Sequence, residues 1–270
     1  MKYIINYSSG GLGNRLKPLG SCQLISLQTE RKLAMTWGLT PACNARYSEL
    51  YTNDIDIVDL SQLPPEDVSI YSEPEWVEHD VRLNKNPHLY NLMSKAGCTR
   101  LSYSNNIIKD NKKYIIVYSN TYLPGYENIG DFLKSLDPVK YIKDQVNEFI
   151  KINNIDSNIV GVHARSTDFT NSSPEIYTSK MFAYNGNFYV CSDSHEMESS
   201  IINKFPGRVI TRNKNYVIKE NSNIGTWVNN IMRNEASVID AIIDMMILSK
   251  TKFEIYHNES SFAEIVKLLQ

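Results

Sequence analysis

The chain has 270 residues, of which 42% are hydrophobic and 21% charged, and its formal net charge is −2 at pH 7. This length and composition suffice for one large core or two modest ones. The balanced charge argues against a nucleic-acid-binding protein, and no apolar run is long enough for a membrane span. The first residues form a strand-like run without the layout of a signal peptide. The four cysteines show no CxxC spacing, so we expect buried free thiols in a cytoplasmic protein rather than metal ligands or disulfides.

The first half of the chain begins as an α/β unit and then becomes less regular. An apolar strand over Tyr3–Tyr7 precedes a glycine-rich segment and a predicted helix that extends to about Trp37. Short apolar pieces broken by prolines follow over residues 40–110. Tyr114–Ser119 is predicted to be another core strand.

The second half alternates regularly between helical and strand-like periods. The predicted elements are a helix from Pro138, a strand ending at His163, a strand at Asn187–Cys191, a helix at Ser194–Phe205, a strand at Arg208–Thr211, a helix at Glu235–Ser249, a strand at Phe253–His257 and a helix from Ser261. Such alternation predicts a parallel sheet with helices on both faces. We therefore predict an α/β fold with two Rossmann-like domains, residues 1–137 and 138–270.

The most informative segment is Ile159–Asp168, in which an apolar strand delivers His163, Arg165 and Asp168 within six positions. Side chains alternate along a strand, so His163 and Arg165 leave its end on the same side. Ligands of open α/β sheets bind beyond the carboxyl ends of strands, and an arginine there suits a phosphate. The alternative is a surface arginine paired with Asp168.

The glycine-rich segment Ser8–Leu16 follows the first strand and contains Gly10, Gly11 and Gly13. Glycines let the backbone turn sharply and approach a ligand, and amides at a helix start face an anion. A dinucleotide fingerprint would need a glycine where Leu16 stands, so the pattern does not favour a NAD site. The alternative is a purely structural turn.

Taken together, these segments resemble the α1,6-type fucosyltransferases and the related nodulation and protein O-fucosyltransferases. That group carries a Gly-Gly-type loop followed by Asn, and a His-x-Arg-x-x-Asp motif in its second half. Three further segments agree in order: Phe188–Ser194 with the strand ending in Thr/Ser-Asp-Asp, Val238–Ser249 with a helix that carries an Asp before a Leu-Ser end, and His257–Phe262 with a Ser-Ser turn. The resemblance is continuous from about Val160 to Phe262 and only local before that.

The resemblance implies a GT-B fold, in which two Rossmann-like domains face a cleft and the N-terminal domain forms the acceptor side. It also implies transfer of fucose from GDP-fucose to a glycan or glycoconjugate, without a cofactor or metal ion. Charge builds up on the departing diphosphate, so donors aimed at it lower the barrier. Arg165 is the first candidate for that contact, and Asp244 is expected to accept the N–H groups of guanine. The other donor-binding residues that the resemblance implies are Gly11, Gly13, Asn14, His163, Asp193, Ser260 and Ser261.

Several of these residues also have a structural interpretation. Asp244 could be an exposed residue on a polar helix stripe, although burial among its apolar neighbours would require partners for its carboxylate. His163 could be a packed core histidine, and Ser260 and Ser261 could simply cap the last helix. The nearest Asp-x-Asp triplet, Asp54–Asp56, is flanked by an ordinary loop, which does not favour a metal–diphosphate site.

The catalytic base is the least defined residue. Glu175 lies nearest the position of a glutamate in the α1,6-type enzymes, and Asp168 is the second candidate. Ser166 stands where the family has a second arginine, and Phe169 where it has a lysine. These departures leave two alternatives open: a glycosyltransferase that uses another nucleotide-sugar, and a GDP-binding module without transfer activity.

Overall fold

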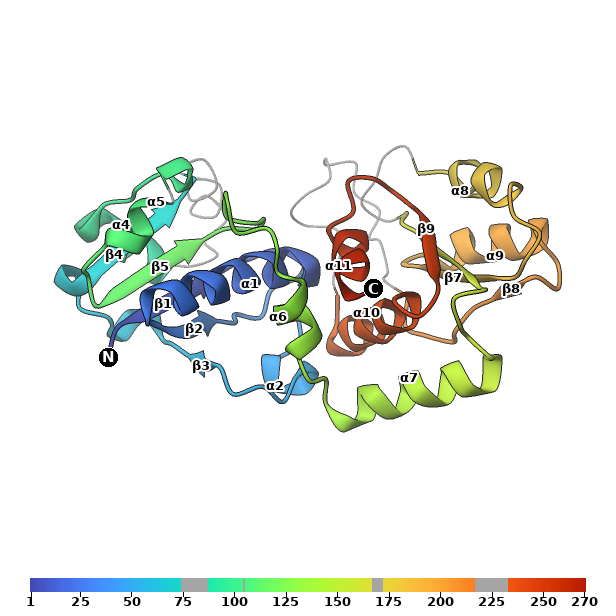
Figure 1. Ribbon diagram of the computed structural model, residues 1–270, viewed down its shortest axis with the longest axis horizontal. Coiled ribbons are helices and arrows are strands. Elements are labelled where there is room, and N and C mark those ends of the chain that lie inside the picture. The colour runs from blue at the N-terminus through green and yellow to red at the C-terminus, as the bar shows by residue number, and fades with distance from the viewer. Residues whose placement is uncertain (74–86, 104, 167–171, 217–232) are drawn as a thin grey trace. The chain divides into compact units, whose positions relative to one another are not determined.

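The computed structural model describes residues 1–73, 87–103, 105–166, 172–216 and 233–270 (Figure 1). Its chain divides into two compact units. Unit 1 comprises residues 1–38 and 53–136, and unit 2 comprises residues 39–52 and 137–270. Unit 2 thus resumes at Asp137, one residue before the sequence-based boundary.

Within its described residues, unit 1 is built on a five-stranded parallel sheet of order β3-β2-β1-β5-β4. The strands are β1 (Tyr3–Tyr7), β2 (Lys32–Thr36), β3 (Asp56–Ile57), β4 (Val68–Ser72) and β5 (Tyr114–Tyr118). The helices are α1 (Leu12–Thr29), α4 (Pro87–Ala96), α5 (Asn105–Lys109) and α6 (Gly130–Ser135), with 3-10 turns η1 (Leu60–Gln62), η2 (Pro65–Asp67) and η3 (Leu101–Tyr103). From β1 the chain continues to β2 and β3 on one side and then crosses to β4 and β5 on the other. The switch point of this sheet therefore lies between β1 and β5.

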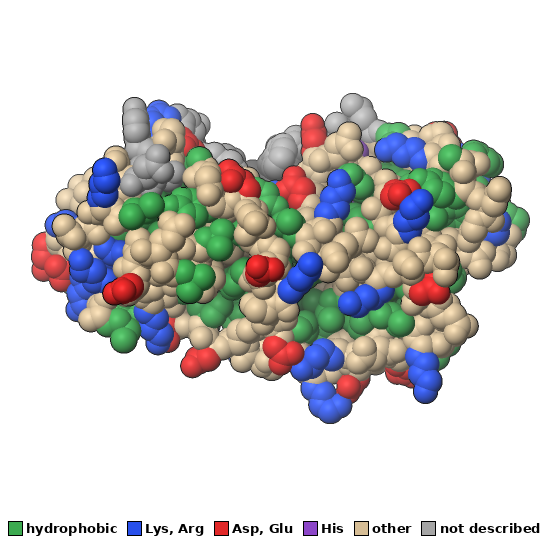
Figure 2. Space-filling model, in the orientation of Figure 1, with side chains coloured by type: hydrophobic (Ala, Val, Ile, Leu, Met, Phe, Trp, Pro, Cys, Tyr) green, Lys and Arg blue, Asp and Glu red, His purple; other side chains and the backbone are tan. Residues whose placement is uncertain are grey.

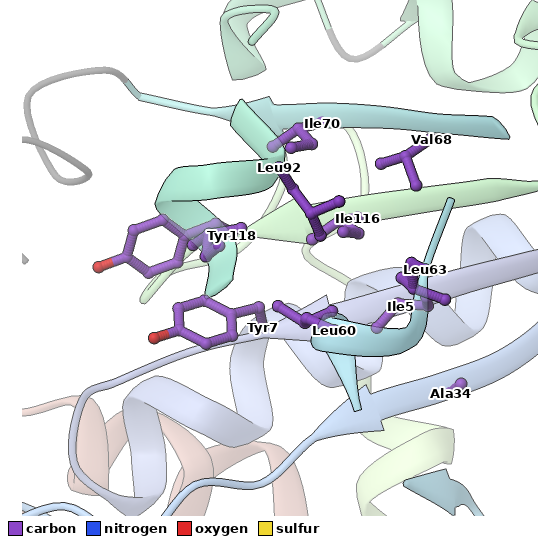
Figure 3. Packing of buried hydrophobic residues seen from close by; sticks show 11 residues of the cluster. Ile5, Tyr7, Ala34, Leu60, Leu63, Val68, Ile70, Leu92, Ile116 and Tyr118 are labelled. Carbon is purple, nitrogen blue, oxygen red and sulfur yellow. The ribbon is translucent and has the colours of Figure 1, made fainter. Parts of the chain in front are cut away.

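On one face of this sheet, η1 and α4 pack against the strands and enclose a hydrophobic core (Figure 3). Leu92 of α4 points toward Ile70 and Ile116, and Leu60 lies over Ile5. The rings of Tyr7 and Tyr118 pack edge to face with centroids 4.8 Å apart. Alternation along β1 and β5 gives this face its apolar side chains, as expected for strands buried on both faces.

The predicted helix from the glycine segment to Trp37 is wrong in its second part. The helix α1 ends at Thr29, where Glu30 adopts a left-handed conformation with φ of 53°. Residues Lys32–Thr36 then form β2, which pairs in parallel with all five residues of β1. Strand pairing with β1 therefore overrides the continuous helical period that the sequence indicates.

Unit 2 is built, in its described residues, on a four-stranded parallel sheet of order β8-β7-β6-β9. The strands are β6 (Val160–Ala164), β7 (Phe188–Ser192), β8 (Val209–Ile210) and β9 (Lys252–Tyr256). The helices are α2 (Tyr47–Leu50), α7 (Lys140–Asn153), α8 (Pro174–Met181), α9 (His195–Lys204), α10 (Glu235–Leu248) and α11 (Ser261–Leu269). The four strands and the helices α7, α9, α10 and α11 match predicted elements, whereas α2 and α8 were not predicted. The α/β class with two Rossmann-like units is confirmed. The cleft between the domains that a GT-B fold adds stays a prediction.

The two faces of the unit 2 sheet have different partners. Val160 and Val162 belong to a core that includes Tyr177 and Met181 of α8 and side chains of α9. On the other face, a Cβ on Gly161 would lie 2.2 Å from Thr251 Oγ1. Glycine is therefore required where β6 passes under the end of α10, and His163, two residues later, faces the same side.

The segment 39–52 is a correction to the predicted domain boundaries, since it belongs to unit 2. Thr52 donates its N–H to the carbonyl of Asp137 at 2.8 Å, and Val139 donates to Leu50 at 3.0 Å. Tyr51 forms an isolated bridge with Pro138. These contacts join residues almost 90 positions apart, which local sequence patterns do not show.

The surface carries charges of both signs, interspersed with hydrophobic side chains over the visible face (Figure 2). Among the described residues, no helix is long and apolar enough to cross a membrane. All four cysteines are free, and three of them, Cys22, Cys43 and Cys191, are buried.

Candidate functional site

The strand order of unit 2 places a switch point between β6 and β9. The chain runs from β6 through β7 to β8 on one side and then crosses back to β9 on the other. In open α/β sheets, ligands bind beyond the carboxyl ends of the strands at such a point. The residues there, His163, Arg165, Ser166, Asp193 and Ser260, are called the β6–β9 site below.

His163 lies one residue before the end of β6, and its ring is buried and neutral. It stacks on Phe262 of α11 with ring centroids 4.3 Å apart, and its Nδ1 lies 3.4 Å from Ser260 Oγ. Burial, followed by the nearby charge of Arg165, lowers the pKa of His163 to about 3. The imidazole can therefore donate or accept a hydrogen bond at neutral pH but carries no charge there.

Arg165 is half-buried and follows β6 directly. Its carbonyl accepts hydrogen bonds from the hydroxyls of Tyr177, at 3.0 Å, and Ser172. The N–H of the next residue, Ser166, donates to Asp193 Oδ1 at 2.9 Å. Asp193 thus fixes the backbone after β6, while its predicted contact with the donor stays a prediction. The backbone that carries Arg165 is held from α8 and from the residue after β7.

Ser260 and Ser261 lie at the start of α11. Ser260 is buried and its Oγ accepts from Ala263 N–H at 3.2 Å, so it is the N-cap of the helix. Ser261 is half-buried at the first helical position. Ser260 also lies against His163, so the start of α11 is adjacent to the end of β6. The predicted phosphate contact of the two serines stays a prediction.

Asp244 is buried in α10, and its carboxylate has three partners within unit 2. Oδ1 accepts from the Tyr189 hydroxyl at 2.6 Å and from Arg212 Nε at 3.2 Å, and Oδ2 accepts from Lys214 Nζ at 2.8 Å. The interpretation of Asp244 as an exposed residue is therefore wrong, because its side chain is only 6% exposed. The expectation that burial requires partners is met.

These contacts belong to a larger carboxylate network, defined here as Tyr189, Glu198, Arg212, Lys214, Asp240 and Asp244. Lys214 Nζ also contacts Glu198 Oε1 at 2.6 Å, and Arg212 contacts Asp240 Oδ1 at 2.6 Å. The main chain and side chain of Asn215 donate to Asp240 Oδ2 as well. The segment after β8 is therefore held against α10 and α9 by charged hydrogen bonds.

The charges in the network compensate one another. Burial alone would raise the pKa of Asp244, but Lys214 and Arg212 outweigh it and the pKa is lowered. For Lys214, burial would lower the pKa, yet Asp244 and its other neighbours raise it. Asp244 and Lys214 are thus both ionised near neutral pH. The network lies next to β6, because Tyr189 belongs to β7, which pairs with β6 along its whole length.

The glycine segment of unit 1 follows the carboxyl end of β1, as Arg165 follows the carboxyl end of β6 in unit 2. Gly11 precedes α1 in an extended conformation, Gly13 is buried in the first turn, and Asn14 is half-buried beside Gly10. Gly10 donates its N–H to Asn120 Oδ1 at 2.9 Å, and a Cβ at Gly10 would lie equally close to that oxygen. The segment is thereby attached to the loop after β5, at the switch point of its own sheet.

The two candidate bases differ in what the structure shows. Glu175 is exposed in the first turn of α8, and its carboxylate lies 2.5 Å from Lys204 Nζ. The hydrogen bond from Lys204 lowers the pKa of Glu175 to about 2, which makes it a weak base in this state. Asp168 lies outside the described residues. Both roles stay predictions.

Some site residues carried no recognisable sequence signal. Arg212, Lys214 and Glu198 are scattered charges whose pairing depends on the fold, and Tyr177 and Ser172 reach the Arg165 carbonyl from α8 and the residues before it. Asn120 could have been found, because it directly follows the predicted strand Tyr114–Ser119.

Comparison with known proteins gives similarity at the level of structure alone. No family model matches the chain, and no curated protein matches its sequence significantly. The whole chain aligns with fucosyltransferase NodZ from Bradyrhizobium, at a TM-score of 0.66 and 14% identity over 92% of that chain. The TM-score is 0.64 for NodZ α-1,6-fucosyltransferase co-crystallised with GDP. It is 0.57 for apo POFUT1, with 15% identity over 94% of that chain.

This similarity defines the fold of the chain as that of the NodZ and POFUT1 structures. The predicted resemblance to the fucosyltransferase group is confirmed at that level. Structures of NodZ soaked with GDP-fucose and of POFUT1 in complex with GDP-fucose are similar as well, at TM-scores of 0.63 and 0.52.

Proposed function

We propose that the chain is a glycosyltransferase that transfers fucose from GDP-fucose to a hydroxyl group of a glycan or glycoconjugate. The observation that carries the proposal is the β6–β9 site. It combines an arginine on an anchored backbone, a buried neutral histidine and a serine-capped helix start at one strand end. The similarity to structures that hold GDP or GDP-fucose supports the same assignment.

Each group has a role in the proposed reaction. The β-phosphate gains charge as the bond to the anomeric carbon breaks, and Arg165 offers two parallel hydrogen bonds to it. Ser260, Ser261 and the first amides of α11 bind further phosphate oxygens. His163 contacts the base or ribose through a neutral ring nitrogen, and Asp244 pairs with guanine.

Gly11, Gly13 and Asn14 of the glycine segment are proposed to bind phosphate at the switch point of the unit 1 sheet. Unit 1 also binds the acceptor. A carboxylate, Glu175 or Asp168, takes the proton of the acceptor hydroxyl; for Glu175 this requires release from Lys204. No metal ion takes part in this mechanism.

A panel of nucleotide-sugars tests the proposal. Incubation with GDP-fucose, GDP-mannose, UDP-glucose and UDP-N-acetylglucosamine, followed by mass spectrometry, reports both slow hydrolysis and transfer to added glycans. We expect turnover of GDP-fucose above the others. Turnover of another donor would replace the sugar or nucleotide in the proposal, and tight GDP binding without turnover of any donor would favour the binding module.

A further inference from the structure

Asp244 has fewer free acceptor positions than guanine recognition requires. A carboxylate accepts about four hydrogen bonds, and three are already made by Tyr189, Arg212 and Lys214. Guanine presents two N–H groups, from N1 and the 2-amino group, to a single carboxylate. Five donors exceed the four positions, so one of the three internal donors has to leave when the base binds.

Lys214 is the donor that can leave with the smallest loss. The Tyr189 hydroxyl is buried with Asp244 as its hydrogen-bond acceptor, and Arg212 is a rigid fork that also holds Asp240. Lys214 makes a single bond to Asp244 from a flexible stem, and its ammonium keeps Glu198 Oε1 at 2.6 Å as a second partner. Leaving Asp244 therefore does not leave the ammonium buried without a counter-charge.

We propose that Lys214 is a specificity-determining residue whose ammonium occupies the position on Asp244 that guanine takes. The base displaces the ammonium from Oδ2, and Glu198 retains it. This inference rests on the proposed function, because it takes Asp244 as the acceptor for guanine. Lys214 thereby competes with the base but not with the diphosphate.

Two substitutions have opposite expected effects on base recognition. In Lys214→Met the competitor is absent, so the affinity for GDP relative to inorganic pyrophosphate rises about 10-fold, the equivalent of one charge-assisted hydrogen bond. In Glu198→Gln the displaced ammonium loses its second counter-charge, so the same ratio falls. Loss of the lysine charge weakens the binding of both GDP and pyrophosphate, because both carry phosphates. The ratio of the two affinities is therefore the informative quantity.

Isothermal titration calorimetry with GDP and with pyrophosphate measures this ratio for the wild-type chain and each variant. Lys140→Met is the matched control, because it removes an exposed lysine paired with Asp144 on α7 and leaves the ratio unchanged. Thermal unfolding shows which variants are folded, and Glu198→Gln decides alone if Lys214→Met is not. A purely structural role of Lys214 would leave the ratio unchanged in Glu198→Gln, and would leave it unchanged or lower it in Lys214→Met.

The outcomes separate the inference from the proposed function. Turnover of GDP-fucose by the wild-type chain, with a ratio that neither variant changes, overturns the inference alone. A wild-type chain that binds GDP no more tightly than pyrophosphate overturns the inference together with guanine recognition by Asp244. If the wild-type chain binds neither GDP nor pyrophosphate, both the inference and the proposed function are overturned.

Discussion

Replacement of Asp244 by asparagine tests how strongly the carboxylate network stabilises unit 2. Asparagine keeps the size of the side chain and one carbonyl acceptor, but it removes the charge that faces Arg212 and Lys214. Removing one partner of a buried ion pair costs about 3–5 kcal/mol, because the remaining charge stays buried. Arg212 retains Asp240 and Lys214 retains Glu198. We therefore expect a loss near the lower limit, about 3 kcal/mol of unfolding free energy.

Urea denaturation followed by far-UV circular dichroism measures this loss. Asp144→Asn is the control, since it breaks an exposed pair with Lys140 and should change stability by less than about 0.5 kcal/mol. The pKa of Asp244 is lowered in the folded chain, so its contribution is present above the unfolded pKa and disappears as pH falls through the folded pKa. The difference between wild type and variant should therefore shrink in acid. A loss below about 1 kcal/mol at neutral pH would refute the stabilising role.

Three further predictions concern binding, metal and pH. Asp244→Ala should raise the GDP dissociation constant about 10- to 150-fold, a loss of roughly 1.5–3 kcal/mol, while the ADP dissociation constant changes little. Calorimetry on the folded variant measures both constants. An unchanged GDP affinity would remove Asp244 from base recognition. Transfer should persist in EDTA, because Asp56 of the Asp54–Asp56 triplet begins β3 and pairs with Lys32 instead of following the carboxyl end of a strand. Loss of transfer in EDTA and its restoration by Mn²⁺ or Mg²⁺ would contradict this. The lowered pKa of His163 means that the unfolded chain binds more protons than the folded chain between its folded value of about 3 and its ordinary value of 6.5. Stability should fall as pH drops through that range, by up to about 1.4 kcal/mol per pH unit from this residue, and His163→Gln should remove that part of the slope; equal pH dependence in both proteins would be inconsistent with a buried neutral ring.

Most of the fold of unit 2 could be predicted, because its strands and the helices α7, α9, α10 and α11 have local signals, whereas α2 and α8 were not predicted. Uninterrupted apolar runs mark β6 and β7, Ser194 caps α9 as expected, and Pro206–Gly207 follows that helix. The strand β2 had no such signal, since neither glycine nor proline separates it from α1 and only the backbone of Glu30 turns. Its identity depends on pairing with β1, a long-range contact.

The site shows the same division between local and long-range information. His163, Arg165 and Ser260 could be placed together because strand ends meet at one edge of a parallel sheet. The partners of Asp244 could not be predicted, because Lys214 and Arg212 lie about 30 positions away in an irregular segment. A buried carboxylate predicts that partners exist but does not identify them.

Turnover of GDP-fucose by Arg165→Ala, measured together with its GDP affinity, tests the central claim most directly. If Arg165 stabilises the departing diphosphate, its contact strengthens as the bond breaks, so the substitution should lower kcat more than it weakens GDP binding. Removal of one such donor costs about 3–4 kcal/mol of transition-state stabilisation, or roughly 10²–10³ in rate. Arg165→Lys should recover only part of this, because a point charge does not reproduce the two-pronged geometry. Near-wild-type turnover by a folded Arg165→Ala protein would contradict the assignment of the β6–β9 site as the catalytic centre.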